Sequence, residues 1–213
     1  MNKENLQNII KYFESRYKNP RPALKFESNY QLMVAVILSA QCTDERVNQV
    51  TAVLFKDYPT PQKMVELSQE QLERYIYSCG FYHNKAKSIL SATRDLLEKY
   101  GGEVPSDYDS LLALAGVGRK TANVISSVAF GIPAIAVDTH VFRVSNRIGL
   151  ANASTPEKTE QQLRALLPVE KWSDCHHYII FYGREVCKAR NPACAQCEIS
   201  KYCDYFNAQA SKK

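Results

Sequence analysis

Four cysteines crowd into one short segment near the carboxyl end, and no other feature of this 213-residue sequence restricts the fold so strongly. They follow the pattern Cys187-x6-Cys194-x2-Cys197-x5-Cys203, with Pro192 inside the loop. Four thiolates this close together suit a tetrahedral site, and a CxxC step wraps one face of a metal ion or cluster. The total of seven cysteines is odd and no secretory signal precedes them, which argues against a disulfide scaffold. On ligand chemistry alone, a zinc ion and a 4Fe–4S cluster both remain open.

The rest of the chain is patterned for helices. Apolar residues recur at helical spacing, and no segment alternates with the period of two that a half-buried strand requires. Residues 132–137 (IPAIAV) form a short extended run at most. The sequence therefore predicts an all-α fold of many short helices joined by tight loops.

Several helix ends are marked by residues that satisfy free backbone groups. Ser28 with Gln31, and Ser68 with Gln71, each predict a capping box at a helix start. Gly80 is expected to end the helix that begins after Ser68, since glycine is favoured just beyond helix ends.

Composition sets broader limits. The chain is 45% hydrophobic and 23% charged, which is ordinary for a globular protein. Its net charge of +5 favours a polyanionic partner only weakly. The longest apolar run, residues 32–38, is far too short to span a bilayer. We expect a cytoplasmic monomer with no membrane association.

A glycine-rich turn interrupts the helical pattern within residues 111–124 (LLALAGVGRKTANV). Gly116-Val117-Gly118 permits unusual backbone angles and close approach of another backbone. Its N–H groups, with those of the helix that follows, would form an anion-binding concavity suited to phosphate. Such a contact would position a nucleic acid without reading its sequence. The alternative is a simple helix–helix turn whose basic residues are only solvated.

Lys120 stands where a cation is disfavoured. It is expected in the first turn of a helix, where the helix dipole presents its positive end, and Arg119 beside it adds a like charge. Both effects favour the neutral amine, which is the form that a nucleophilic lysine needs. Surface lysines also break this preference, so a merely solvated residue is the alternative.

Asp138 closes the extended run and directly precedes another helical pattern. An N-cap role suits it, and a capping carboxylate facing a cleft could also stabilise positive charge developing at a sugar C1′. His140 is either structural or phosphate-facing, and a structural role is favoured. His176 and His177 have no partner at metal-ligand spacing, so packing is the better interpretation.

Taken together, these segments resemble the endonuclease III family of helix-hairpin-helix DNA glycosylases over nearly the whole chain. The matching stretches are LSAQCTD (38–44), LAGVGRKTANV (114–124), AVDTHVFRV (136–144), DCHHYIIFYGREVC (174–187) and the four-cysteine loop. The cysteine spacing is very specific for the 4Fe–4S loop of this family, so the resemblance favours that cluster over zinc.

The resemblance implies two helical domains that grip DNA. Residues 22–132 would form a six-helix barrel containing the hairpin at about 111–124, and residues 1–21 with 133–213 would form the domain that carries the cluster loop, 187–203. The implied activity is that of a bifunctional glycosylase and AP lyase of base excision repair. Such an enzyme removes oxidised pyrimidines from duplex DNA through a Schiff base and cuts the abasic strand by β-elimination.

The resemblance also assigns roles to residues. Lys120 would be the nucleophile and Asp138 the essential carboxylate. The expected DNA contacts are Gln41, which would fill the space left by the damaged base, together with Phe81, Gly116, Val117, Gly118, Arg119 and His140. Cys187, Cys194, Cys197 and Cys203 would hold the 4Fe–4S cluster, in a structural or redox-linked role.

Three positions depart from the family pattern. Ala115 replaces a proline before the hairpin, Phe81 stands where an aliphatic wedge is more usual, and Cys42 replaces a smaller residue. The change at Phe81 bears on the preference for the opposite base, since either kind of side chain can push between stacked bases. Two other functions remain open: a monofunctional mismatch adenine glycosylase, a class that lacks the lysine, and a non-catalytic DNA-binding module with a structural metal.

Overall fold

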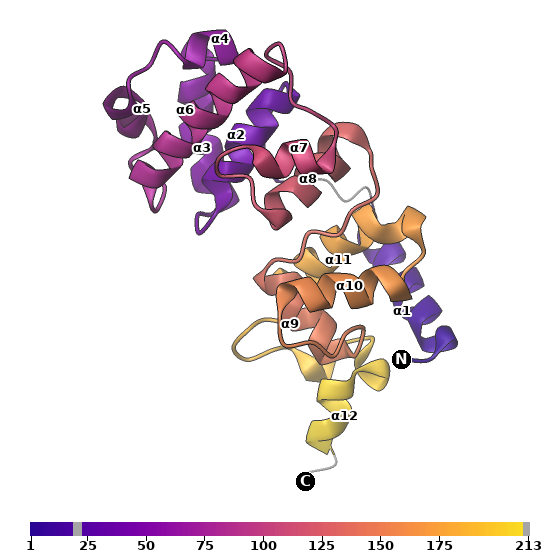
Figure 1. Cartoon of the computed structure of the whole chain (residues 1–213). Helices are drawn as coiled ribbons and strands as arrows, with labels where there is room; N and C mark the ends of the chain where they lie inside the picture. Colours follow the sequence, from indigo (N-terminus) through magenta and orange to yellow (C-terminus); the bar gives the residue numbers. More distant parts are fainter. Residues whose placement is uncertain (19–22, 211–213) are drawn as a thin grey trace. The chain divides into compact units, whose positions relative to one another are not determined.

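The computed structural model describes residues 1–18 and 23–210, and within them the chain forms helices and no strands (Figure 1). It divides into two compact units, Pro22–Ile132 and a discontinuous unit made of Met1–Arg21 with Pro133–Lys213. The domain boundary expected at residues 21–22 lies outside the described residues. No helix in the described part has the length and apolarity needed to cross a bilayer.

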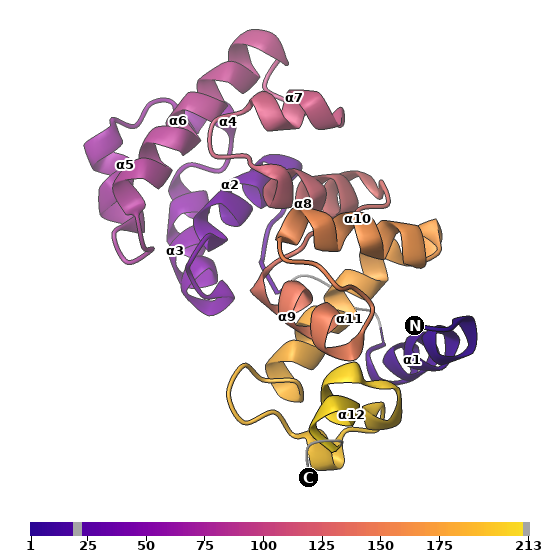
Figure 2. The ribbon, with the colours of Figure 1, turned by 60° about the horizontal axis from the view of Figure 1, so that its bottom comes forward.

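The contiguous unit is built around one central helix. Its helices are α2 (Asn29–Ser39), α3 (Asp44–Asp57), α4 (Pro61–Met64), α5 (Gln69–Ile76), α6 (Tyr82–Lys99), α7 (Tyr108–Ala113) and α8 (Arg119–Phe130). Every residue from Leu32 to Leu38 in α2 is buried, because α3, α6 and α8 all pack against this helix (Figure 2). A helix that is apolar on all sides has to lie inside a domain.

The discontinuous unit joins the two ends of the chain. It contains α1 (Lys3–Arg16), α9 (Thr139–Ile148), α10 (Pro156–Leu166), α11 (Trp172–Glu185) and α12 (Asp204–Ala210), with short 3-10 turns at Val169–Lys171, Cys194–Gln196 and Ser200–Tyr202. Phe13 of α1 packs edge-on against Tyr182 of α11, with ring centroids 5.2 Å apart. Arg16 and Glu185 form an ion pair beside this aromatic contact. The N-terminal helix is thereby fixed to a helix from the far end of the sequence.

The predicted helix starts are mostly confirmed. Ser68 and Gln71 form a complete capping box at α5. Ser28 caps α2 by accepting from the N–H of Gln31, but the Gln31 side chain accepts from the N–H of Glu27 instead of returning to Ser28, so that capping box is incomplete. Residues 132–137 carry no strand, as expected, and the last four of them, Ala134–Val137, lead as a buried segment to Asp138.

The predicted helix end at Gly80 is wrong. Helix α5 ends at Ile76, four residues earlier, and the chain turns through residues 77–81 before α6 begins. The left-handed backbone that ends such a turn is adopted by Phe81, with φ 59°, and not by the neighbouring glycine. A non-glycine residue in this conformation carries a modest steric cost, so the surrounding packing must impose it.

Candidate functional site

The hairpin between α7 and α8 depends on one glycine for its shape. Gly116 has φ +80°, and a Cβ placed there would lie 2.8 Å from the Cβ of Ser88 and 3.4 Å from Cγ2 of Ile37. Both the backbone angle and the contact with α6 therefore exclude a side chain at this position. The second glycine, Gly118, has φ −90° and an open space where its Cβ would stand. None of the described residues lies close enough to require a glycine there.

Helix α8 begins without a capping side chain. Gly118 is its N-cap residue, and Arg119 and Lys120 follow in the exposed first turn. The start of a helix presents N–H groups and the positive end of the dipole, so an uncapped start is suited to bind an anion. Lys120 lies in this exposed first turn, directly after the uncapped start of the helix.

Val117 contributes to this hairpin in a different way from its neighbours. Its side chain is buried, with 5% of its surface exposed, and its N–H donates to the carbonyl oxygen of Leu114 at 3.1 Å. Val117 therefore anchors the turn to the core. Of the predicted DNA-contacting residues in the hairpin, Gly116, Gly118 and Arg119 are the exposed ones.

Asp138 is the N-cap of α9. Its Oδ1 accepts a hydrogen bond from the N–H of Val141 at 2.7 Å, and the residue is only partly exposed. The buried segment Ala134–Val137 fixes the chain that leads to it. The cap leaves Oδ2 available, since no hydrogen bond to it is formed by the described residues. A carboxylate held in this way keeps one oxygen for a ligand.

His140 lies within the first turn of α9 and has a structural contact. The Nη2 group of Arg143 lies 3.2 Å from its Nδ1, and the same guanidinium donates to the carbonyl oxygens of Gly183 and Cys187 at 3.0 and 3.2 Å. Gly183 is needed for this packing, because a Cβ there would lie 3.1 Å from the Cβ of His140. His176 and His177 are both buried in α11, in line with a packing role.

Gln41 and Phe81 occupy two neighbouring loop tips in the contiguous unit. Both are exposed, Phe81 by 65%, and both have left-handed backbones, with φ 53° and 59°. The carbonyl oxygen of Gln41 lies 3.5 Å from the position that a Cβ of Gly80 would take, so the two loops are adjacent. The structure brings together two loops whose exposed residues, Gln41 and Phe81, lie 40 positions apart in the sequence and were both predicted to contact DNA.

The four cysteines of the C-terminal loop line one cavity. Cys187, Cys194, Cys197 and Cys203 are unbridged and share this cavity with apolar and aromatic side chains, among them Tyr182, whose hydroxyl lies 2.7 Å from the Cys197 sulfur. Four thiols with an apolar surround form a donor set that fits an iron–sulfur cluster. Among the described residues, no group of three or more His, Cys, Asp or Glu side chains is arranged to hold a single metal ion.

Arg147 of α9 holds the start of this loop, a role that no pattern in the sequence indicates. Its guanidinium donates to the carbonyl oxygens of Lys188 and Ala189 at 2.7 and 3.1 Å and lies 4.8 Å from the ring centroid of Tyr205. Its backbone carbonyl accepts from the Cys203 thiol at 3.3 Å. The helix that begins at Asp138 therefore also supports the cysteine loop.

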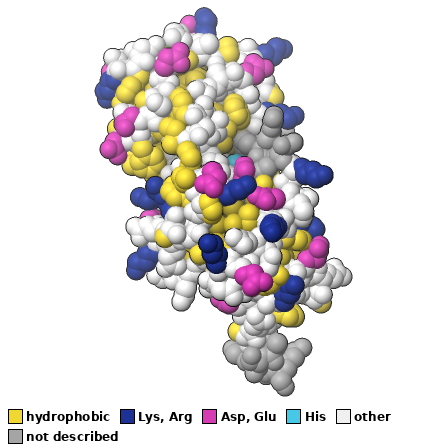
Figure 3. Space-filling view, turned by 90° about the vertical axis from the view of Figure 1, so that its right-hand side faces the viewer, with side chains coloured by type: hydrophobic (Ala, Val, Ile, Leu, Met, Phe, Trp, Pro, Cys, Tyr) yellow, Lys and Arg dark blue, Asp and Glu magenta, His cyan; other side chains and the backbone are white. Residues whose placement is uncertain are grey.

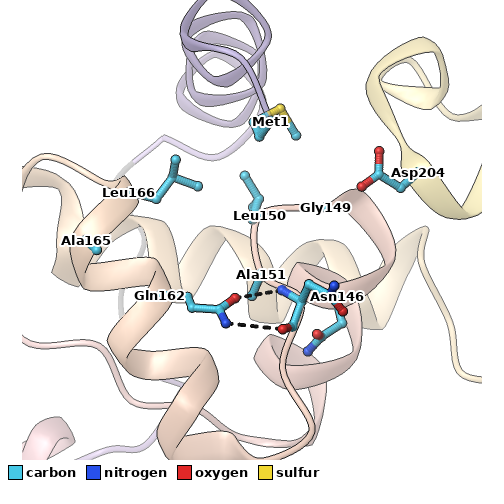
Figure 4. A pocket seen from close by; sticks show the side chains of 10 residues that line it. Met1, Asn146, Gly149, Leu150, Ala151, Gln162, Ala165, Leu166 and Asp204 are labelled. Carbon is cyan, nitrogen blue, oxygen red and sulfur yellow. Dashed lines mark hydrogen bonds between the residues drawn. The ribbon is translucent and has the colours of Figure 1, made fainter.

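Surface charge and pocket size do not locate the site. On the face shown in Figure 3, Lys and Arg side chains lie scattered among Asp and Glu side chains. A pocket of about 680 Å³ lies in the discontinuous unit, where Gln162 pairs with the backbone of Asn152 through bonds of 2.7 and 3.1 Å (Figure 4). None of the predicted site residues lines this pocket.

Comparison with known proteins identifies the family. Residues 34–169 match the model described as HhH-GPD superfamily base excision DNA repair protein, and residues 187–203 match the iron–sulfur binding domain of endonuclease III. Endonuclease III of Rickettsia conorii is 47% identical over 198 residues, covering 93% of this chain and 94% of that protein. Endonuclease III of Bacillus subtilis is 51% identical over 175 residues, covering 82% and 80% respectively.

A solved structure agrees in both sequence and fold. It is described as a trapped endonuclease III–DNA covalent intermediate in an estranged-adenine complex, and it matches with a TM-score of 0.93 at 43% identity, covering 99% of each chain. The predicted all-α fold is confirmed by this match. The chain belongs to the endonuclease III family of HhH-GPD superfamily base excision DNA repair proteins.

Proposed function

We propose that this member of the endonuclease III family, a DNA glycosylase with AP lyase activity, excises oxidised pyrimidines with Lys120 as nucleophile and Asp138 as the essential carboxylate. The target nucleotide is flipped out of the duplex, because its C1′ cannot be reached inside the stack. The neutral Lys120 amine forms a bond to C1′ as the bond from C1′ to the base breaks. The base leaves with the bonding electron pair, and Asp138 stabilises the positive charge that develops on the sugar.

The second reaction follows from the first. Ring opening gives a Schiff base between Lys120 and C1′, which acidifies the C2′ proton. Loss of that proton drives β-elimination, which breaks the bond from C3′ to the 3′ phosphate oxygen and cuts the strand on the 3′ side of the lesion. Hydrolysis then releases the lysine. The single observation that carries this proposal is the exposed Lys120 in the first turn of an uncapped helix, directly after a glycine hairpin.

The hairpin is proposed to hold the DNA backbone. The absence of a Cβ at Gly118 and the uncapped N–H groups at the start of α8 would let a phosphate approach closely. Gln41 and Phe81 are proposed to enter the duplex where the nucleotide has left, since they are exposed on adjacent loops. Arg119 would add an electrostatic contact to the phosphates, and the ring of His140 would act through Arg143 more than through DNA.

Cys187, Cys194, Cys197 and Cys203 are proposed as the ligands of the 4Fe–4S cluster that this family carries. Bound there, the cluster supplies a cross-link between four points of the loop and a redox-active centre. The cleavage steps are assigned to Lys120 and Asp138 alone. The two compact units are proposed to act as the barrel domain and the cluster domain, which is supported by their bounds. A monomer in the cytoplasm, at the nucleoid if the source is bacterial, is proposed on the bacterial origin of the relatives.

Borohydride trapping on a duplex with one thymine glycol tests the chemistry. We expect a covalent adduct with the unmodified protein and with Lys99→Gln, a control at an exposed lysine, and no adduct with Lys120→Gln. The Lys120→Gln protein should still bind the duplex, because its hairpin is intact. Base release that leaves an uncut abasic strand would instead indicate a monofunctional enzyme, and neither adduct nor release would indicate a binding module.

A further inference from the structure

Lys85, in the first turns of α6, is a buried cation with an unusual set of partners. Only 6% of its surface is exposed, and its Nζ donates to the carbonyl oxygens of Leu38 at 2.8 Å and Ala40 at 2.7 Å. Among the described residues no Asp or Glu forms an ion pair with it. Burial lowers the pKa of Lys85, because desolvation disfavours the ammonium form.

The free-energy cost of burying the ammonium group is offset by contacts with the end of a helix. Leu38 and Ala40 belong to the C-terminal turn of α2, whose last carbonyl groups have no partner within the helix and carry the negative end of its dipole. Two charge-assisted hydrogen bonds therefore fix the point where the chain leaves α2. The next residue along the chain is Gln41.

The same residue also touches the second loop. The backbone N–H of Lys85 donates to the carbonyl oxygen of Phe81 at 3.1 Å, which begins α6. Its side chain thus holds the loop of Gln41 while its backbone holds the loop of Phe81. Cys42 directly follows Gln41 and Cys79 directly precedes Gly80. Burial raises the pKa of the Cys79 thiol to about 11, and the nearby Cys42 thiol adds to this rise.

We propose that Lys85 is a positioning residue that holds Gln41 against the Phe81 loop in the conformation needed to fill the space left in the duplex. The inference rests on the proposed function, in which Gln41 and Phe81 enter the DNA. Gln41 has φ 53°, a left-handed conformation that a non-glycine side chain does not favour by itself. The ammonium group supplies the constraint, because the peptide between Ala40 and Gln41 cannot turn over without losing the bond to the Ala40 carbonyl.

A double-mutant cycle tests this role. Lys85→Met keeps the apolar stem of the side chain but removes both hydrogen bonds, and Gln41→Ala removes the inserted group. We expect Lys85→Met to weaken binding to a duplex with a tetrahydrofuran abasic analogue about tenfold, since two buried carbonyls lose their partner and the loop relaxes. In the Gln41→Ala background the same change should have little further effect, because Lys85 acts through Gln41.

Lys99→Met is the matched control, since Lys99 lies at the exposed end of the same helix and loses the same charge. It should bind as the unmodified protein does. An equal loss from Lys85→Met with and without Gln41 would overturn the proposal and leave Lys85 a structural residue. If Lys85→Met does not fold, as judged by thermal unfolding, Lys85→Gln replaces it in the same cycle, because its amide still donates hydrogen bonds but carries no charge.

Single-stranded DNA separates this inference from the proposed function. An abasic site in a single strand offers no gap for Gln41 to fill, so borohydride trapping there should be the same for Lys85→Met and the unmodified protein. Absence of trapping in the unmodified protein, on the duplex as well as on the single strand, would count against the Lys120 chemistry. Trapping that is normal on single strands and on duplexes in every Lys85 variant would count against the role of Lys85 alone.

Discussion

At the scale of single residues, the two glycines of the hairpin have different physical roles. Gly116 is required by the protein itself, because its φ is positive and Ser88 occupies the space of its Cβ. Gly118 satisfies neither condition, since its φ is negative and the space beside it is open. The absence of a side chain at Gly118 is therefore better explained by what approaches from outside.

Alanine at each glycine should separate these two roles. We expect Gly116→Ala to lower the free energy of unfolding by about 1–3 kcal/mol, through backbone strain and the contact with Ser88. Gly118→Ala should unfold at the same temperature as the unmodified protein but bind duplex DNA more weakly. Thermal unfolding and fluorescence anisotropy measure the two effects. A stable Gly116→Ala protein, or a destabilised Gly118→Ala protein, would contradict this division.

At the scale of secondary-structure elements, the start of α9 combines a structural and a chemical task. Asp138 caps the helix through one oxygen, and the proposed function uses its carboxylate charge. Asparagine is as good an N-cap as aspartate, so the cap and the charge can be removed separately. Arg143 and Arg147, further along the same helix, bind backbone carbonyls of α11 and the cysteine loop, which makes α9 a common support.

Asp138→Asn should therefore keep the fold and lose the reaction. The asparagine Oδ1 can accept from the N–H of Val141 as Asp138 does, so the unfolding temperature should change little. Base release should fall by about a hundredfold or more, since removal of one electrostatic stabiliser typically costs that much. Asp138→Ala is the comparison, because it should lose both activity and about 1 kcal/mol of stability. An active Asp138→Asn protein would exclude a role for the carboxylate charge.

The limits of sequence interpretation also appear at the level of elements. Asp138 and the hairpin glycines were predictable because capping and turn chemistry depend on neighbouring residues. Lys85 and Arg147 were not, since they bind carbonyl oxygens 45 and 41 positions away and any residue can supply a carbonyl. The helix end at Gly80 was predicted wrongly because local preference favours glycine, whereas tertiary packing puts Phe81 in the left-handed conformation.

At the scale of the whole molecule, each unit has its own buried core, and the cysteine loop belongs to the discontinuous one. The contiguous unit packs around Met33, Val34 and Leu38, and the discontinuous unit packs around Phe13, Val144 and Tyr182. All four proposed cluster ligands lie in residues 187–203. Three of them belong to or pack against the core of the discontinuous unit, and Cys194 lines the cavity beside it. Loss of the cluster should therefore affect one unit first.

Removal of iron tests this separation. After chelation, amide hydrogen exchange should accelerate in residues 187–203 and in the ends of α11 and α12, because the loop loses a cross-link that stabilises it. Exchange in α2 and α6 should stay slow, since their core contains none of the proposed ligands. Mass spectrometry of peptic fragments measures both regions in one experiment. Equal acceleration in both units would show that the cluster stabilises the whole chain.

The contact between α1 and α11 has a consequence for the order of folding during synthesis. Arg16 and Glu185 are 169 positions apart, so α1 leaves the ribosome long before the helix that covers Phe13 exists. At the usual pace of translation this interval is roughly ten seconds or more. Residues 22–132 are contiguous and can fold within it, while Leu6, Ile9 and Phe13 remain without their partners. The nascent chain can therefore hold a folded contiguous unit while the apolar face of α1 is still uncovered, and it is in this interval that α1 is most open to capture by a chaperone.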